Sequence, residues 1–129
     1  MGPNEVSQIV IGCVLRVHTV LGAGLLESAY DPCVFYEFVK AGLRFEHQVS
    51  VPIIYEGIRI APAFRVDYIV ENCLILELKC VAKLQPVHLA QTLTYLKLTK
   101  IKLGLLINFH VPHLRNGIRR VINGPQSEL

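Results

Sequence analysis

The chain of 129 residues has the length of a single domain, a formal net charge of +3 at pH 7 and a charged fraction of only 18%. It contains no apolar run of the roughly 18 to 20 residues that a membrane span requires and no secretory signal pattern, so we expect a cytoplasmic location and no membrane partner. The mild basicity permits a nucleic-acid partner, and the hydrophobic fraction of 52% leads to the hypothesis of a homo-oligomer that covers part of the apolar surface.

Two helices are predicted in the first third of the chain. Residues 7–20 place apolar side chains at helical spacing, and the glycines that follow end this helix. A second helix is predicted over residues 26–40, with Gly42 as its left-handed C-terminal cap. Because Pro32 inside it lacks a backbone N–H, we expect a kink there or a helix that restarts at Asp31-Pro32.

From Phe45 onward the pattern indicates strands. Residues 49–54 alternate, Glu56-Gly57 is typical of a turn, and residues 64–70 and 74–79 form two further extended runs. A helix is predicted over 86–98, a buried strand over 102–109 and a short closing helix over 115–123. The order ααβββαβ predicts one α/β domain, residues 1–129 with a core of about 7–123, in which helices flank a mixed β-sheet.

Asp67, Glu77 and Lys79 are charged residues within the largely apolar hairpin of residues 64–70 and 74–79. Glu77 and Lys79 share one face because side chains alternate along a strand. A three-residue loop, Glu71 to Cys73, places Asp67 opposite Glu77 on that face, whereas a two-residue loop would turn Asp67 away. We predict the three-residue loop, since Asn72 tolerates left-handed backbone angles.

This group of side chains has two interpretations. Two neighbouring carboxylates repel unless a cation lies between them, and such oxygen ligands suit Mg²⁺ or Mn²⁺. The metal would polarise a phosphate oxygen and activate a water, with Lys79 orienting that water or stabilising the developing charge, which together describe phosphodiester hydrolysis. The alternative is a partly exposed ion-pair network at a sheet edge.

The order and spacing of several motifs resemble the GxxExxY family of the PD-(D/E)XK nuclease superfamily over about residues 7–123. The naming motif is Gly24-Leu25-Leu26-Glu27-Ser28-Ala29-Tyr30, and the superfamily signature matches Asp67 with Glu77-Leu78-Lys79. Residues 86–97 resemble the helix that follows, and residues 104–109 resemble the final core strand. The resemblance implies a restriction-endonuclease-like core and a Mg²⁺- or Mn²⁺-dependent nuclease acting on DNA or RNA.

The resemblance also implies individual roles. Asp67, Glu77 and the Leu78 carbonyl would hold the metal, which Glu27 would also approach, and Lys79 would be the catalytic lysine. Gln91 would orient Lys79 or a phosphate. His88 and Tyr95 on the same helix are candidates for nucleic-acid contact. With Gln91 between them, these residues stand at i, i+3 and i+7 and so lie on one stripe of the helix.

Several residues have a structural interpretation beside the functional one. Tyr30 is expected to be either a motif residue with its own role or a core aromatic, and His18 is expected to be a structural hydrogen-bonding histidine. His110 and His113 are interpreted as loop residues. Arg115, Arg119 and Arg120 would contact phosphates or form a solvated basic face.

Two further functions remain open on the sequence alone. Ala82 and Leu89 stand where relatives are expected to carry acids, which suits a nucleic-acid-binding module with a vestigial site. The apolar composition also suits a structural or interaction protein that assembles with itself. The intact set of Asp67, Glu77 and Lys79 favours the nuclease.

Overall fold

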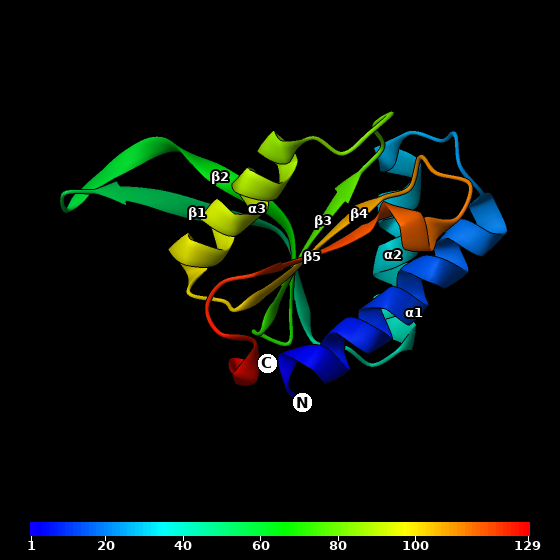
Figure 1. Cartoon of the computed structure of the whole chain (residues 1–129), viewed down its shortest axis with the longest axis horizontal. Helices are drawn as coiled ribbons and strands as arrows, with labels where there is room; N and C mark the ends of the chain where they lie inside the picture. The colour runs from blue at the N-terminus through cyan, green and yellow to red at the C-terminus, as the bar shows by residue number, and fades with distance from the viewer.

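The computed structural model describes the backbone of residues 1–129 and all side chains except those of residues 62 and 63. Helix α1 (Pro3–Leu21) buries Val6, Val10, Cys13 and Val17, a spacing that places them on one helical face. Helix α2 (Glu27–Lys40) lies beside α1, and both pack on the same face of the sheet (Figure 1). None of the helices described has the length and apolarity needed to cross a bilayer.

The expectation that α2 restarts at Asp31-Pro32 is wrong, because α2 is one helix from Glu27 to Lys40. Pro32 removes only the hydrogen bond to the carbonyl four residues earlier. The residues on either side, Tyr30 and Val34, are both fully buried in one core, and this packing offsets the lost bond. The helix ends at Lys40, and Gly42 follows two residues later with the predicted left-handed φ, +73°.

A single five-stranded sheet follows in the order β1-β2-β3-β4-β5. Its strands are β1 (Phe45–Tyr55), β2 (Ile58–Val70), β3 (Leu74–Lys79), β4 (Leu103–Asn108) and β5 (Ile118–Ile122). Only β3 and β4 are parallel, and helix α3 (Pro86–Thr99) connects them across the face opposite α1 and α2 (Figure 1). The predicted α/β class with a mixed sheet is therefore confirmed.

The predicted closing helix over residues 115–123 is wrong. A short 3-10 helix, Leu114–Gly117, leads instead into β5, where Ile118 pairs with Ile107 and Ile122 with Leu103. The β-branched residues of this segment suit a strand, and the segment covers what would otherwise be the unpaired edge of β4.

The β1–β2 hairpin is longer than predicted, because β2 begins at Ile58 directly after the Glu56-Gly57 turn. Both turn residues have positive φ, +50° and +79°, as a tight two-residue hairpin loop requires. Figure 1 shows this hairpin extending past α3 as an arm.

The close packing of α3 on the sheet depends on Gly104 in β4. A Cβ atom at this position would lie 2.9 Å from Cγ2 of Thr92. The glycine therefore allows α3 to approach the face of the sheet on which Ile75 and Glu77 lie, since alternate residues of β3 share a face.

Candidate active site

The turn between β2 and β3 sets the geometry of the site. Val70 pairs with Leu74 and Tyr68 with Leu76, which leaves three residues, 71–73, in the loop. Glu71 and Asn72 both have left-handed φ angles, +50° and +55°. The predicted three-residue loop is therefore confirmed, and continuing the same pairing sets Asp67 opposite Glu77.

Hydrogen bonds connect the two acidic residues across the hairpin. The backbone N–H of Asp67 donates to Oε2 of Glu77 over 3.2 Å, and the backbone N–H of Leu78 donates to Oδ2 of Asp67 over 2.8 Å. The two carboxylates thus lie on the same side of the hairpin. Each uses one oxygen to accept a backbone hydrogen bond.

Burial and like charge act together on Glu77, which is only 6% exposed. Burial raises the pKa of its carboxyl most strongly, and the neighbouring Asp67 raises that pKa further, to about 9, against a smaller lowering by Lys79. With this raised pKa, the Glu77 carboxyl keeps its proton at neutral pH. A cation that took the place of the proton would relieve the same repulsion.

Lys79 ends β3 and shares the face of Glu77, two residues earlier. Its strand position is fixed from β4: Lys79 pairs with Asn108, and the Lys79 carbonyl accepts a hydrogen bond from the N–H of Phe109 over 2.9 Å. Asn108 is almost fully buried, and its side chain bonds both the N–H (3.1 Å) and the carbonyl (2.9 Å) of Val81. Asn108 therefore holds the chain segment that leaves Lys79.

Sequence reasoning did not assign this role to Asn108. The available signal was a single polar residue at the end of the near-continuous apolar run of residues 103–109. Such a residue, buried in the sheet, must find hydrogen-bond partners close by, and the loop after Lys79 supplies them.

Glu27 is the first residue of α2, and the helix start directs it toward the same region. Burial raises the pKa of its carboxyl, Asp67 and Asp31 raise that pKa further, and Lys79 lowers it. Glu27 is thus within electrostatic reach of Asp67 and Lys79. Among the described side chains, however, no three or more of the His, Cys, Asp and Glu type are grouped as metal ligands, so the structure brings together only Asp67 and Glu77 of the predicted set.

A family model provides an independent comparison. The model of the PD-(D/E)XK nuclease superfamily matches residues 4–121, nearly the whole chain. The chain belongs to the PD-(D/E)XK nuclease superfamily. No curated protein matched the chain, and no solved structure matched it. Superfamily membership gives the arrangement of Asp67, Glu77 and Lys79 a chemical context that an ordinary surface ion-pair network would lack.

In this PD-(D/E)XK chain, Tyr30 shapes the loop that precedes Glu27. Its hydroxyl donates to the carbonyl of Gly22 over 2.5 Å and accepts a hydrogen bond from the N–H of Leu25 over 3.2 Å. The fully buried ring stacks on Phe109 with 4.3 Å between centroids. Gly24 permits the loop's φ of +99°, so both motif residues determine where α2 begins.

His18 is held by the loop that follows β4. Its Nε2 lies 2.9 Å from the carbonyl oxygen of Val111. Because a carbonyl only accepts, Nε2 carries the hydrogen in this contact. The contact matches the structural interpretation of this histidine. His110 and His113 are exposed in the loop after β4.

The three residues of the predicted stripe on α3, His88, Gln91 and Tyr95, lie in different surroundings. Nδ1 of His88 accepts a hydrogen bond from the N–H of Gln85 over 2.9 Å and so closes the first helical turn. Gln91 and Tyr95 line a small cavity of about 150 Å³ beside Phe64. Burial raises the pKa of the Tyr95 hydroxyl, and the charges of Glu77 and Asp67 raise that pKa further. Of the three predicted residues, Tyr95 is thus shown to be within electrostatic reach of the carboxylates.

Arg115 and Arg119 lie on the segment that leads into β5. Both are exposed, and Nη1 of Arg119 donates to the carbonyls of Asn116 and Ile118 over 3.0 Å each. Arg115 makes no ion pair within the part of the chain whose side chains are described.

A polar network beside the site was not predicted. The Tyr68 hydroxyl donates to Oδ1 of Asp31 over 2.7 Å, and Nε2 of His47 lies 2.8 Å from Oδ2 of Asp31. The His47 ring also stacks on Tyr68 with 4.5 Å between centroids. The network ties α2, β1 and β2 together next to Asp67 and one helical turn after Glu27. Its members are far apart in the sequence, and they meet only through the β1–β2 pairing of His47 with Tyr68 and the packing of α2 on the sheet.

Proposed function

We propose that this PD-(D/E)XK chain is a nuclease of the GxxExxY family that hydrolyses phosphodiester bonds in DNA or RNA with Mg²⁺ or Mn²⁺. One observation carries the proposal: the buried carboxylate of Glu77 and the half-buried carboxylate of Asp67 share one side of a hairpin whose last residue is Lys79. An exposed ion-pair network has no need for two neighbouring carboxylates that repel each other, one of them buried.

The residues present suit a divalent cation. Asp67 and Glu77 each have a second carboxylate oxygen besides the one that accepts a backbone hydrogen bond, and the Leu78 carbonyl follows directly along β3. Two carboxylates, a carbonyl and water molecules form a donor set that Mg²⁺ and Mn²⁺ accept. Because the pKa of Glu77 is raised, cation binding would release a proton near neutral pH.

When bound, the metal supplies a Lewis acid for a phosphate oxygen and for a water molecule. The chain's own groups then have separate tasks. The Lys79 ammonium donates hydrogen bonds that orient the attacking water or balance the negative charge that develops on the phosphate. Glu27 adds a carboxylate at the start of α2, and Gln91 from α3 provides an amide that orients Lys79 or a phosphate oxygen.

A cleavage assay tests the proposal directly. Single- and double-stranded DNA and RNA are incubated with the chain in Mg²⁺, Mn²⁺ or chelator, and the wild type is compared with Lys79→Ala and Asp67→Ala. We expect metal-dependent cleavage that falls by about a hundredfold or more in either variant, the range expected for a group that transfers protons or stabilises charge. Lys97→Ala removes the same charge from an exposed position on α3 and serves as the control. Cleavage that survives both site substitutions would refute the nuclease.

The second candidate is a nucleic-acid-binding module whose site no longer turns over. Ala82 and Leu89, which replace the acids expected in relatives, favour it. This candidate predicts binding that weakens steeply with salt, as phosphate contacts are screened, and no product in any metal. The same samples, measured for binding and for cleavage, separate the two candidates.

A further inference from the structure

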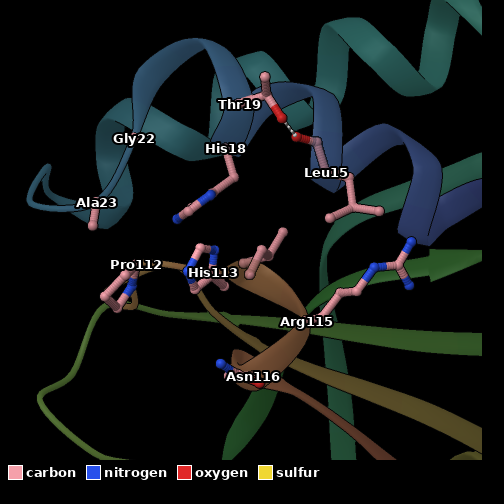
Figure 2. Close-up of a pocket in the computed structure, with 10 residues that line it drawn as sticks. Leu15, His18, Thr19, Gly22, Ala23, Pro112, His113, Arg115 and Asn116 are labelled. Atoms are coloured by element: carbon pink, nitrogen blue, oxygen red, sulfur yellow. Dashed lines mark hydrogen bonds between the residues drawn. The ribbon is translucent and has the colours of Figure 1, made fainter.

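A cavity of about 690 Å³ lies between the C-terminal half of α1 and residues 112–116. Figure 2 shows His18 extending from α1 toward His113, with Arg115 reaching up from the opposite wall. Neither the carboxylate pair nor Lys79 lines this cavity, so it is separate from the candidate active site. Its volume lies within the roughly 300 to 1,000 Å³ that small-molecule sites occupy.

The lining has a mixed chemistry. Leu15, Pro112 and Leu114 supply apolar surface, while His18, His113, Arg115 and Asn116 supply polar groups, and no aspartate or glutamate is among the described residues of the wall. A guanidinium suits a phosphate, and planar guanidinium and imidazole groups also stack on nucleobases. The wall therefore suits a ligand that combines a negative charge with a flat, partly apolar ring.

The wall also fixes how such a ligand would lie. The last turn of α1, which ends at Leu21, presents the negative end of the helix dipole near Gly22 and Ala23. A phosphate is repelled from that end and attracted to Arg115, which is exposed and makes no ion pair among the described residues. The ring of the ligand then lies toward α1 and its phosphate toward residues 113–116.

A smaller cavity extends this basic surface toward the candidate active site. It measures about 140 Å³, shares Asn116 with the larger cavity, and is lined by Lys83 and Arg119. Asn108 also lines it, and Asn108 pairs with Lys79 across β3 and β4. Positive groups thus run from the large cavity to the end of the strand that carries Lys79.

We propose that the cavity between α1 and residues 112–116 binds one unpaired nucleotide of a nucleic-acid strand whose backbone continues toward Lys79. The proposal rests on the proposed function for the identity of the strand, but binding at the cavity does not require turnover. Arg115 holds the phosphate, the imidazoles and Asn116 contact the base, and the apolar wall covers its face. Duplex DNA, whose bases are stacked and paired, does not enter.

The test measures binding of a short labelled single strand and of a blunt duplex by fluorescence anisotropy. All proteins carry Lys79→Ala so that the strands stay intact. In this background Arg115→Ala removes the phosphate contact, and Ala23→Phe fills the cavity from an exposed loop position without changing any charge. The control is Arg44→Ala, which removes the same charge next to the β2–β3 loop, at the end of the sheet opposite Lys79.

We expect both cavity variants to bind the single strand about tenfold more weakly and Arg44→Ala to bind it as the parent does. Arg115→Ala should also reduce the slope of log affinity against log salt by about 1, whereas Ala23→Phe should leave the slope unchanged. The affinity for the duplex should be the same in Arg115→Ala, Ala23→Phe and Arg44→Ala.

The proposal would be overturned if the parent and both cavity variants bound the single strand with equal affinity. It would also be overturned if the cavity variants lost duplex binding to the same extent as single-strand binding. Adenosine 5′-monophosphate, added as competitor, distinguishes a strand from a free nucleotide: binding of the mononucleotide that is tighter than that of the strand would also overturn it. If the wild type binds through the cavity but cleaves no substrate, the proposed nuclease fails and the nucleotide site stands.

Discussion

At the scale of single residues, the Tyr30 hydroxyl connects both ends of the loop that precedes Glu27. It donates to Gly22 and accepts from Leu25, and its ring is fully buried against Phe109. Tyr30→Phe keeps the ring and deletes both hydrogen bonds. We expect a loss of about 1–2 kcal/mol in the free energy of unfolding, measured by urea denaturation.

Tyr36 provides the matched control, since it lies on the same helix but is 63% exposed. Tyr36→Phe should leave the free energy of unfolding unchanged within error. If both substitutions have the same effect, the Tyr30 hydroxyl does not hold the loop.

Glu77 makes stability depend on pH in a defined direction. In an unfolded chain its carboxyl has a pKa of about 4.3. In the folded chain, burial and the neighbouring Asp67 raise this pKa. The folded state therefore keeps a proton that the unfolded state releases. The associated stability is present at low pH and is lost as pH rises toward the folded-state pKa.

We therefore expect the metal-free protein to have a lower Tm at about pH 8 than at about pH 6, and Glu77→Gln to abolish this difference. Mg²⁺ should raise the Tm of the wild type more at the higher pH, because it competes with the proton, and should not stabilise Glu77→Gln to the same extent. A Tm of the metal-free wild type that does not fall over this range would contradict the raised pKa of Glu77.

At this scale the sequence predicted what strand alternation and loop length determine. The pairing of Asp67 with Glu77 followed from counting three loop residues. The contacts of Asp31 with His47 and Tyr68 could not be predicted in this way, because they depend on how α2 lies on the sheet.

At the scale of elements, the contact between α3 and β4 is set by one missing side chain. Gly104→Ala would bring a Cβ atom to 2.9 Å from Cγ2 of Thr92. The threonine methyl cannot rotate away freely, because its hydroxyl donates to the His88 carbonyl over 3.1 Å. We expect Gly104→Ala to lower the free energy of unfolding by about 1–3 kcal/mol, as measured by denaturation.

Thr92→Ser supplies the second arm of a double-mutant cycle. Serine keeps the hydroxyl that bonds His88 and lacks the methyl group that the new Cβ would meet. The double variant should therefore recover part of the stability lost in Gly104→Ala, with a coupling of about 1 kcal/mol. Additive losses would show that the helix shifts and that Thr92 is not the obstacle.

Element prediction succeeded where one periodicity dominates and failed where packing decides. The buried strand β4 and helix α3 were evident from their apolar pattern. Pro32 led to the expectation of a break in α2 because its missing hydrogen bond costs free energy locally. The sequence does not show the buried residues on either side, whose packing offsets that cost. The predicted helix over residues 115–123 was wrong because this segment pairs with β4 through the β-branched Ile118, Val121 and Ile122, a contact that only the assembled sheet provides.

At the scale of the whole molecule, the order of elements predicted the α/β class but not the layout of the sheet. The two helices before the first strand and the single helix between β3 and β4 require helices on both faces once β3 and β4 are parallel. The sequence did not reveal that β5 closes the far edge or that the β1–β2 hairpin extends as an arm. Both features depend on surfaces that only the assembled sheet presents.

The arm provides a physical basis for the predicted homo-oligomer. Ile54, Tyr55 and Ile58 near its tip are between 55% and 63% exposed. Strand β1 is an edge strand, yet Pro52 and the irregular pairing between Val51 and Ile53 prevent a second strand from pairing along it. Association of two copies through the arm would therefore use apolar side chains and not backbone hydrogen bonds.

Sedimentation over a range of concentrations measures this association. We expect the mass of the wild type to rise with concentration and that of Ile54→Lys to stay at one chain, because a charge at the contact must be desolvated without a partner. Val20→Lys, at an 81% exposed position on α1, makes the same change away from the arm and should behave as the wild type. A single-chain mass for the wild type at every concentration would show that the arm has no role in assembly. Loss of association in Val20→Lys alone would show that the copies associate through the α1 face and not through the arm.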